Sequence, residues 1–382
     1  MEVGIIRKRE RMTYTNHYQP SYPDMELLQQ AEAELKRTKP VTSIENVKKL
    51  RTQFMEISTN KSNTPIVMLG PCAEHVSLEE NIHDIIDGYQ KLHETTDSLY
   101  EGNVLPIIRG AGQASKPRSL EMEGGQYSYY GDMVNSLNGN RTPDPSRMVA
   151  AAIQSRDISK TLEDNNSQHV MLAHEALLLP YERNFILDGD GNQFLASADM
   201  PWIGERTRKK GSLQVQLLED IYNPIGIKIG PETTQDDISY IVKKLNPSVE
   251  PGKLAFIFRF GRDSINNASA ILDAINRLAP KSLIISDPCH GNTLKIQNRN
   301  GQIQKTRIVE DMIDEVVGIS DICKMYGMKL HGLHLEAVAM SGDKKQCIDK
   351  MGELPNCESE VDPQLNILQL RKLLKATKEL LL

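Results

Sequence analysis

The stretch SDPCHGNT, residues 286–293, holds three side chains that can bind a metal within four positions of one another. Asp287, Cys289 and His290 follow an apolar run, and a carboxylate, a thiolate and an imidazole are all ligands of divalent transition metals. Each also has a structural alternative, because a buried thiol packs like a small apolar group and a carboxylate can orient a histidine ligand. What lies beside them in the fold decides which of the three carries chemistry.

Three further potential ligands lie far from this stretch along the chain. Cys72 and Glu336 come at the ends of other apolar runs, and Asp362 lies in EVDPQLN just before a final helical pattern. Together with His290 they form a mixed set that suits Mn²⁺, Fe²⁺, Co²⁺ or Zn²⁺. The spacings are too long for a sequence motif, so the set is a candidate metal site only if the fold brings its members together. The competing interpretations are a buried apolar thiol for Cys72 and helix capping for Asp362.

Basic side chains form a second set of candidate binding groups, and most of them end an apolar run. Guanidinium groups bind carboxylates and phosphates through paired hydrogen bonds, and lysine adds a compact charge. The set is Arg109, Lys116, Arg118, Arg206, Lys228 and Arg259, with Lys305 and Arg307 as further candidates. If these cations converge, the substrates carry several negative charges, as two phosphorylated molecules would. For Arg208 and Arg307 a structural ion pair or a solvated charge is the competing interpretation.

The loop RGAGQASKPRS, residues 109–119, is similar to a phosphate-binding loop without matching a known one. It lacks the GKS/T ending of a Walker A motif, and Ser115 occupies the place of the third glycine in GxGxxG. Lys116, Arg118 and Ser119 nonetheless offer two cations and a hydroxyl on a proline-stiffened loop. We expect this loop to bind a phosphate.

The elements that must position these groups recur from residue 65 onward. Short apolar, β-branched runs alternate with helical patterns, and such continuous runs are typical of strands buried on both faces of a parallel sheet. Eight β-α units that close on themselves form a (β/α)8 TIM barrel, which is the α/β fold that we predict. The predicted strands are PIVMLGPCAE, NVLPIIRG, HVMLAHEA, MPWIGERTR, PIGIKIGPE, KLAFIFRFGR, SLIISDPCHG and LHGLHLEAV, with helices between them over residues 77–93, 234–245, 264–279 and 308–327.

A barrel also predicts where its functional groups lie, because active sites form at the C-terminal ends of the strands. In chain order, these ends supply a charged or reactive residue at every strand. They are Cys72, Arg109, Glu175, Glu205 with Arg206, Lys228, Arg259, His290 and Glu336. The fold would gather the potential metal ligands and the cations at one mouth.

The N-terminal part of the chain precedes the first strand and has a different pattern. Two helical patterns begin there after Asp24 and Ser43, each of which is a predicted N-cap. We expect residues 1–60 to form an N-terminal helical extension and residues 61–382 to form the catalytic barrel.

The composition is that of an ordinary globular enzyme and argues against several other classes of protein. Hydrophobic residues make up 39% of the chain and charged residues 25%, and the net charge of −6 argues against a dedicated nucleic-acid binder. No segment has the roughly 18 apolar residues of a membrane helix, and the N-terminus has no apolar signal core, so we expect a cytoplasmic protein. Five cysteines without a CxxC pair predict free thiols.

Ten motifs of this chain occur in the order found in the type II (plant-type) 3-deoxy-D-arabino-heptulosonate-7-phosphate (DAHP) synthases, and the chain resembles that family over nearly its whole length. The motifs are GPCAE, RGAGQASKPRS, YYGDMVN, HEALLLPYE, WIGERTR, NPIGIKIGP, DPCHGNT, KTR, GLHLE and DPQLN. The resemblance implies a (β/α)8 barrel that condenses phosphoenolpyruvate with D-erythrose 4-phosphate, using a divalent metal, at the entry of the shikimate pathway. These substrates bring two phosphates and one carboxylate, which agrees with the many cations.

The resemblance also implies roles for individual residues. The metal, Mn²⁺ or Co²⁺ with Fe²⁺ and Zn²⁺ as alternatives, would be bound by Cys72, His290, Glu336 and Asp362. The phosphoenolpyruvate site would comprise Arg109, Lys116, Glu205, Arg206, Lys228 and Arg259. The sugar phosphate would contact Lys116, Arg118 and Ser119, and the catalytic residues would be Lys116, Glu205 and His290. Asp287 would then orient His290, and Cys289 would be a packing residue.

The chain departs from the family pattern in places. Pro71 stands where the family usually has Asp, Cys289 where it has Met, and Gln364 where Arg is common. Too few residues separate GDMVN from HEALLLPYE for the extra helical pair that takes part in aromatic amino-acid inhibition in longer members. This predicts a feedback-insensitive enzyme that feeds secondary metabolism, such as phenazine formation. We also expect a homo-oligomer, a dimer or a tetramer.

Two alternatives stay open. The same condensation could use another phosphorylated aldose, such as an amino-sugar phosphate or arabinose 5-phosphate, since barrel loops can change the acceptor without changing the metal or enol site. The second alternative is a barrel that binds phosphorylated metabolites without catalysis. Such a protein is expected to have lost metal ligands or substrate cations, and this sequence retains all of them.

Overall fold

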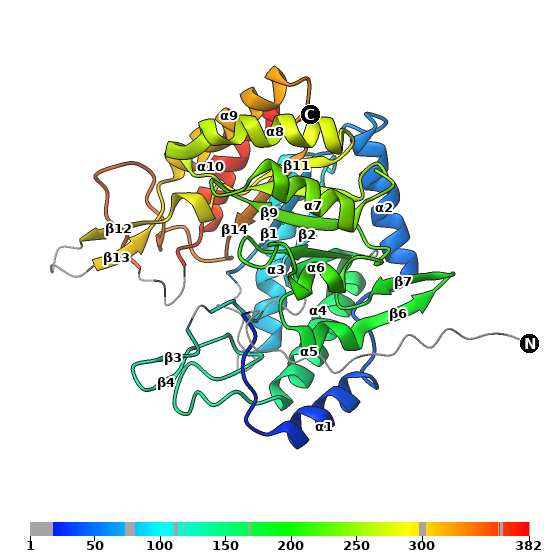
Figure 1. The fold of residues 1–382 in the computed structure, drawn as a ribbon. Coiled ribbons are helices and arrows are strands. Elements are labelled where there is room, and N and C mark those ends of the chain that lie inside the picture. The colour runs from blue at the N-terminus through cyan, green and yellow to red at the C-terminus, as the bar shows by residue number, and fades with distance from the viewer. Residues whose placement is uncertain are drawn as a thin grey trace, which may run out of the picture.

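The computed structural model describes residues 18–72, 81–110, 114–118, 120–166, 169–297, 303–357, 359 and 362–381. Eight of its strands are β1 (Ile66–Gly70), β2 (Leu105–Ile108), β5 (Met171–Glu175), β8 (Met200–Ile203), β9 (Ile225–Ile229), β10 (Leu254–Phe258), β11 (Leu283–Ser286) and β14 (Gly332–Glu336). They pair in parallel and close into a barrel in the order β1-β14-β11-β10-β9-β8-β5-β2, with helices around it (Figure 1). The predicted (β/α)8 barrel and its eight predicted strands are confirmed.

The barrel strands are buried on both faces, which explains their continuous apolar sequences. Every residue of β1, β9, β10 and β14 is buried. One face of each strand fills the barrel interior and the other packs under the helices, so neither face can be polar. Charged side chains are confined to the strand ends, where they face the barrel mouth.

The helices after β1 include the four that the sequence predicts between strands and the final helix that it predicts after Asp362. The long helix between β2 and β5 and the short helix after β8 were not predicted. These helices are α3 (Ile82–Leu99), α4 (Ser146–Asn166), α6 (Leu213–Leu217), α7 (Gln235–Leu245), α8 (Ala268–Leu278), α9 (Val309–Met325) and α10 (Ile367–Thr377). The predicted segments correspond to α3, α7, α8 and α9. The sequence did not predict α4 because small residues such as Ala151, Ala152 and Ser155 lie on its buried side. Its apolar periodicity is therefore weak.

Between β5 and β8 the chain forms no long helix. It forms the short helix α5 (Leu179–Glu182), the 3₁₀ turn η2 (Arg183–Phe185) and a hairpin of β6 (Ile186–Gly189) and β7 (Asn192–Leu195). The N-terminal helix α1 (Met25–Leu35) packs against α4, α5 and η2, so it covers this side of the barrel. As predicted, Asp24 caps it and accepts a hydrogen bond from the backbone N of Leu27 at 2.8 Å.

The second N-terminal helix, α2 (Ile44–Ser58), closes the N-terminal end of the barrel. Its side chains Leu50, Phe54 and Ile57 share one core cluster with residues of the barrel strands. In Figure 1 it lies at the end opposite the hairpin formed by β12 (Leu294–Gln297) and β13 (Ile303–Thr306). The N-terminal helices thus pack into the barrel core, and the division of the chain at residue 60 stays a prediction.

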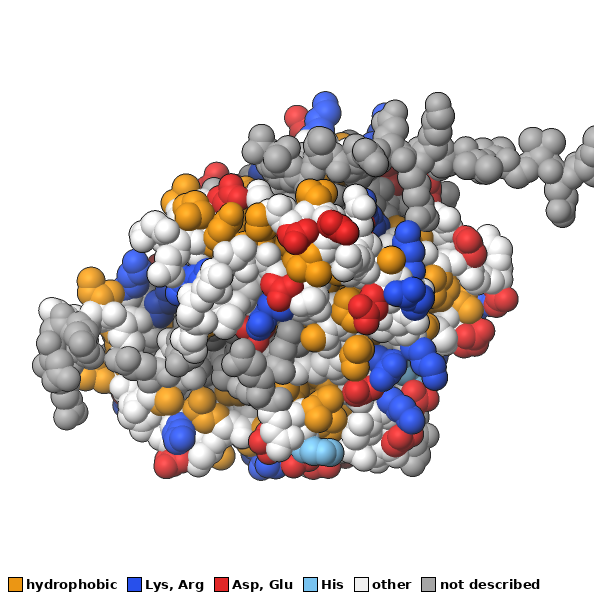
Figure 2. Space-filling view, turned by 90° about the horizontal axis from the view of Figure 1, so that it is seen from below, with side chains coloured by type: hydrophobic (Ala, Val, Ile, Leu, Met, Phe, Trp, Pro, Cys, Tyr) orange, Lys and Arg blue, Asp and Glu red, His pale blue; other side chains and the backbone are white. Residues whose placement is uncertain are grey.

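Two hairpins follow barrel strands at the mouth, β3 (Met122–Glu123) with β4 (Gln126–Tyr127) after β2, and β12 with β13 after β11. Figure 2 shows a face of the molecule on which basic, acidic and apolar side chains are interspersed. Within the described ranges, every helix is too short or too polar to cross a membrane. All five cysteines lie in the described ranges, and none of them is paired in a disulfide.

Candidate active site

A cavity of about 230 Å³ opens at the C-terminal ends of the barrel strands. Each of the eight strands, or the loop that directly follows it, contributes at least one side chain, as expected for a barrel active site. The described residues that line it are Cys72, Arg109, Ser115, Lys116, Pro117, Glu175, Trp202, Gly204, Glu205, Arg206, Lys228, Arg259, His290, Thr293, Glu336 and Asp362. Potential metal ligands and cations therefore meet in one cavity.

Of the predicted site residues that the structure describes, all line this cavity except Arg118 and the further candidates Lys305 and Arg307. Arg118 is on the same loop as Lys116, and its Nε donates to the backbone O of Tyr129 at 2.6 Å. Ser119 lies outside the described residues. The fold thus brings the described residues of this set together, and their individual roles stay predictions.

His290 is held between two carboxylates. Its Nδ1 lies 2.7 Å from Oδ2 of Asp287, and its Nε2 lies 3.1 Å from Oε1 of Glu336. Burial disfavours the charge on Asp287, but His290, Lys228 and the hydrogen bond from His290 outweigh it and hold the Asp287 pKa well below its ordinary value. Asp287 thus contacts His290 in the way expected of an orienting carboxylate.

Glu336, at the end of β14, is surrounded by positive charge. Its Oε2 lies 2.8 Å from Nη1 of Arg307, and its Oε1 lies 3.4 Å from Nη2 of Arg109. Burial opposes the charge on Glu336, yet His290 and Arg307 keep its pKa well below the ordinary value. Arg307 is fully buried, so the structural ion pair considered for this residue is present. The neighbouring thiol of Cys289 is also buried, where its Sγ accepts a hydrogen bond from the backbone N of Glu336.

The other two potential ligands meet at Lys116. Its Nζ lies 2.9 Å from Oδ2 of Asp362 and 4.0 Å from Sγ of Cys72, and Lys305 lies 2.9 Å from the second oxygen of Asp362. Burial opposes the charge on Asp362, but the two lysines lower its pKa far below the ordinary value. Helix α10 is capped by Asn366, so Asp362 is not its cap.

The donor chemistry of this mouth fits a divalent transition metal, while the arrangement keeps the donors in two pairs. A thiolate, an imidazole and two carboxylates suit such ions. In the described part of the chain, no three His, Cys, Asp or Glu side chains are grouped closely enough to hold an ion. The ammonium of Lys116 contacts Cys72 and Asp362, and His290 contacts Glu336. For one ion to be bound by Cys72, His290, Glu336 and Asp362 together, the ammonium group of Lys116 would have to move away from Cys72 and Asp362.

Three further cations line the cavity, and of these Lys228 forms an ion pair while Arg206 and Arg259 donate to backbone oxygens. Nζ of Lys228 lies 3.1 Å from Oδ2 of Asp287, and burial lowers the Lys228 pKa. Nη2 of Arg259 donates to the backbone O of His290 at 3.5 Å, and Nη1 of Arg206 donates to the backbone O of Pro117 at 3.0 Å. The guanidinium edges that point into the cavity can bind carboxylate or phosphate oxygens.

Glu205 is oriented by an arginine that does not line the cavity. Arg208 is fully buried, and its Nη2 donates to Oε1 of Glu205 and to Oγ1 of Thr233, each at 2.7 Å. Its Nη1 lies 3.0 Å from Oδ2 of Asp237, at the start of α7. The structural ion pair considered for Arg208 is therefore present. The second oxygen of Glu205 has no hydrogen-bond partner among the described residues.

Two residues of the cavity have no individual role in the sequence predictions, although Glu175 was expected at the mouth as a strand-end residue. Glu175 ends β5 with a buried Oε1 that lacks a hydrogen-bond partner in the described ranges, and burial raises its pKa. Trp202 is fully buried, with Arg109 Cζ 5.5 Å and Lys228 Nζ 5.7 Å from its ring. A signal for Glu175 was present, because it is the last residue of its strand. A Cβ at Gly204 would meet Glu175 Oε1 at 2.2 Å, which explains the glycine in WIGER.

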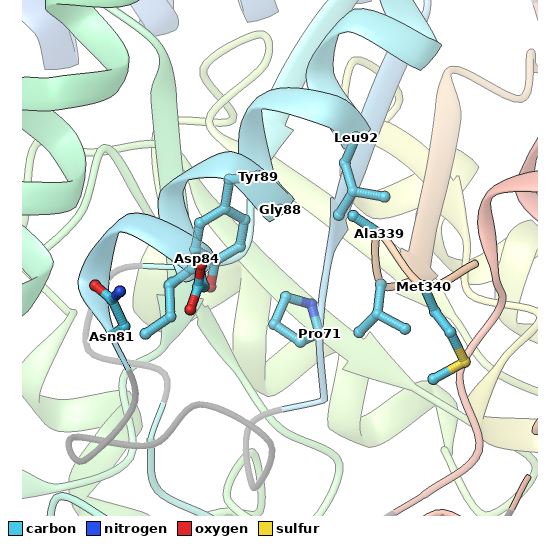
Figure 3. Close-up of a pocket in the computed structure, with 10 residues that line it drawn as sticks. Pro71, Asn81, Asp84, Gly88, Tyr89, Leu92, Ala339 and Met340 are labelled. Atoms are coloured by element: carbon cyan, nitrogen blue, oxygen red, sulfur yellow. The ribbon is translucent and has the colours of Figure 1, made fainter. Parts of the chain in front are cut away.

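A second, larger cavity of about 440 Å³ lies outside the barrel mouth, between α3 and the segment after β14. Figure 3 shows Tyr89 and Leu92 of α3 facing Pro71, Ala339 and Met340 across it. Its walls are mostly apolar, and Asp84 is the charged residue among the described side chains that line it. This chemistry does not suit phosphorylated substrates, so the smaller charged cavity is the candidate active site.

Comparison with known proteins identifies relatives over nearly the whole chain. The sequence model of the Class-II DAHP synthetase family matches residues 7–164 and 156–374. A probable phospho-2-dehydro-3-deoxyheptonate aldolase of Pseudomonas fluorescens is 30% identical over 377 residues, which cover 91% of each chain. The phospho-2-dehydro-3-deoxyheptonate aldolase of Streptomyces coelicolor is 28% identical over 91% of each chain. The enzyme of that name from Neurospora crassa is 29% identical over 91% of this chain and 88% of its own.

Proposed function

Because the chain belongs to the Class-II DAHP synthetase family, we propose that it condenses phosphoenolpyruvate with D-erythrose 4-phosphate. The products would be 3-deoxy-D-arabino-heptulosonate 7-phosphate and inorganic phosphate, in the first step of the shikimate pathway. The observation that carries this proposal is a single cavity that combines a cation cluster with a Cys, His, Glu and Asp donor set. Substrates with two phosphates and one carboxylate match that charge.

The cations would bind and orient phosphoenolpyruvate. Arg206, Lys228 and Arg259 come from three neighbouring strand ends, so they can hold the carboxylate and the phosphate at the same time. Lys116 would bind oxygens of the aldehyde substrate, with Arg118 and Ser119 at its phosphate. Substrates bound in this way would bring C3 of the enol against the aldehyde carbon, where the new carbon–carbon bond would form.

A divalent metal, held by Cys72, His290, Glu336 and Asp362, would polarise the aldehyde as a Lewis acid. The remaining steps need a proton for the new hydroxyl and a water that adds to C2 before phosphate leaves by C–O cleavage. Lys116 and Glu205 line the cavity as candidates for these transfers. Glu175 is a third candidate, because burial raises its pKa and so favours a form that carries a proton.

The proposal is tested by phosphoenolpyruvate consumption in the presence of erythrose 4-phosphate. We expect turnover by the purified protein, loss of turnover after a chelator, and recovery when Mn²⁺ or Co²⁺ is added back. Parallel assays with arabinose 5-phosphate and amino-sugar phosphates test the acceptor. Full activity after exhaustive metal removal would contradict the metal dependence, and no consumption with any aldose would contradict the enzyme.

We further propose that the enzyme is insensitive to aromatic amino acids and serves secondary metabolism, such as phenazine formation. Between Asn135 and His174 the described residues form one helix, α4. This supports the absence of an additional helical pair from this part of the chain.

A further inference from the structure

The loops that follow β10 and β11 touch each other through their backbones. A Cβ added to Gly261 would lie 2.5 Å from the backbone O of Gly291, and one added to Gly291 would lie 2.2 Å from the backbone N of Gly261. Gly261 also has a φ of +77°, which side chains other than glycine rarely adopt. Glycine at both positions allows the two loops to approach this closely.

A buried carboxylate on α9 binds both loops at once. Glu315 is fully buried; its Oε1 accepts a hydrogen bond from the backbone N of Phe260 at 2.9 Å, and its Oε2 accepts one from Nδ2 of Asn292 at 2.7 Å. Oδ1 of Asn292 in turn accepts from the backbone N of Arg262 at 2.9 Å, which fixes the orientation of the amide. Glu315 and Asn292 therefore connect the β10 loop, the β11 loop and helix α9.

These loops carry two different parts of the candidate site. Arg259, a cavity-lining cation, directly precedes Phe260, and His290, a potential metal ligand, lies two residues before Asn292. Nη2 of Arg259 also donates to the backbone O of His290 at 3.5 Å. The separation between the anion-binding group and the imidazole is therefore set where Glu315 binds. Glu315 itself is not among the described residues that line the cavity.

Each oxygen of the Glu315 carboxyl group accepts a hydrogen bond here, and these bonds favour its charged form against burial, which raises its pKa to about 8. The donors are a backbone N–H on one loop and an amide N–H on the other, so a glutamine would satisfy only one of them. Burying a carboxylate is costly unless it is hydrogen-bonded, and here the hydrogen bonds serve to join two loops of the site.

We propose that Glu315, together with Asn292, is a positioning residue that holds Arg259 and His290 at the spacing needed for phosphoenolpyruvate. The inference rests on the proposed function for the identity of the ligand. Loss of the hydrogen bonds from Phe260 and Asn292 to Glu315 should let Arg259 move relative to the imidazole of His290. Displacements of about 1 Å in a substrate-positioning group can lower the rate about 100-fold.

The test compares Glu315→Gln with Glu310→Gln, an exposed residue of the same helix. Steady-state kinetics should show kcat/KM for phosphoenolpyruvate lowered about 10-fold to 100-fold in Glu315→Gln, chiefly through KM, while KM for erythrose 4-phosphate changes little. Glu310→Gln should behave like the wild type. A purely structural role would lower the active fraction and hence kcat, and would leave KM for phosphoenolpyruvate unchanged.

Calorimetric titration of the metal-free proteins with phosphoenolpyruvate gives a second measurement that needs no turnover. We expect the dissociation constant to rise about tenfold in Glu315→Gln. If the wild type binds phosphoenolpyruvate without consuming it with any aldose, the proposed function fails, and the titration still decides this inference. If Glu315→Gln does not fold, Asn292→Ala removes the hydrogen bond from Asn292 to Glu315 instead. It should show the same loss of affinity for phosphoenolpyruvate. The inference would be overturned if, in the folded variant, the dissociation constant and the KM for phosphoenolpyruvate both stay at their wild-type values.

Discussion

Most carboxylates at the barrel mouth are neutralised by a basic neighbour. Glu205 pairs with Arg208, Glu336 with Arg307, and Asp362 with Lys116. Among the described acidic residues that line the cavity, Glu175 differs, since it forms no ion pair there and burial raises its pKa. A carboxyl group that is buried, unpaired and inside a reaction cavity is suited to hold and transfer a proton.

We predict that Glu175→Gln lowers kcat about 100-fold or more, because an amide of the same shape cannot transfer a proton. KM for both substrates should change little, since the substrate-binding cations remain in place. Initial rates of phosphoenolpyruvate consumption measure both constants. Glu45→Gln, an exposed position in the first turn of α2, serves as the control. A Glu175→Gln enzyme with wild-type kcat would exclude a proton-transfer role.

Among the elements, α2 shows how the N-terminal segment stabilises the barrel. Phe54 is fully buried in the cluster formed with residues of the barrel strands, whereas its neighbour Met55 is exposed. Gly252, which precedes β10, has a φ of +70°, and a Cβ there would lie 2.5 Å from the backbone C of Phe54. The helix therefore packs directly on the loop that leads into a barrel strand.

Phe54→Ala should lower the free energy of unfolding by about 3–5 kcal/mol, because it leaves a cavity at the closed end of the barrel. Met55→Ala on the exposed side of the same helix should change it by about 0.5 kcal/mol or less. Denaturant titration followed by circular dichroism measures both values. KM should be unaffected, since the mouth lies at the other end. Equal stability of the two variants would show that α2 does not plug the barrel.

His331, just before β14, couples stability to pH. Burial, with a smaller effect of Lys329, lowers its pKa to about 4, and its Nδ1 accepts a hydrogen bond from the backbone N of Ile284 at 3.0 Å. The unfolded chain takes up a proton at this residue near pH 6.5, and the folded chain does so only near pH 4. This contribution to stability is complete above pH 6.5 and is lost as the pH falls toward 4.

Replacing His331 with Asn should remove this pH dependence, since the Asn oxygen can accept the same hydrogen bond without titrating. Between pH 6.5 and 4 the wild type should lose up to about 1.4 kcal/mol more stability per pH unit than His331→Asn. Thermal unfolding across this range measures the difference. Parallel pH profiles of the two proteins would contradict the assignment.

The whole molecule is a barrel that α2 closes at one end and that carries the candidate site at the other. Its candidate site draws on residues from Cys72 to Asp362, so almost the entire barrel must fold before the cavity exists. The connection from β2 to β5 runs through α4, and that from β5 to β8 through short elements. The described parts of these connections contain no additional helical pair. An inhibitor site that depends on such a pair therefore cannot form there.

We therefore predict that Trp, Tyr and Phe, added singly or together, leave the initial rate of phosphoenolpyruvate consumption unchanged. A chelator in the same assay should abolish the rate, which shows that the assay detects inhibition. Strong inhibition by any of the three amino acids would contradict the proposed insensitivity. A homo-oligomeric state stays a prediction, and light scattering of the purified protein measures it.

The sequence by itself determined the barrel and the strand ends whose charged side chains line its mouth. Buried parallel strands require continuous apolar runs, and only their ends can carry charge, so Arg109, Lys228 and Glu336 were recognisable from pattern alone. The tertiary structure decided which groups meet. It placed Lys116 between Cys72 and Asp362, because residues distant along the chain come together only when the barrel closes. Those contacts depend on three-dimensional distance, which periodicity and spacing in one dimension do not contain.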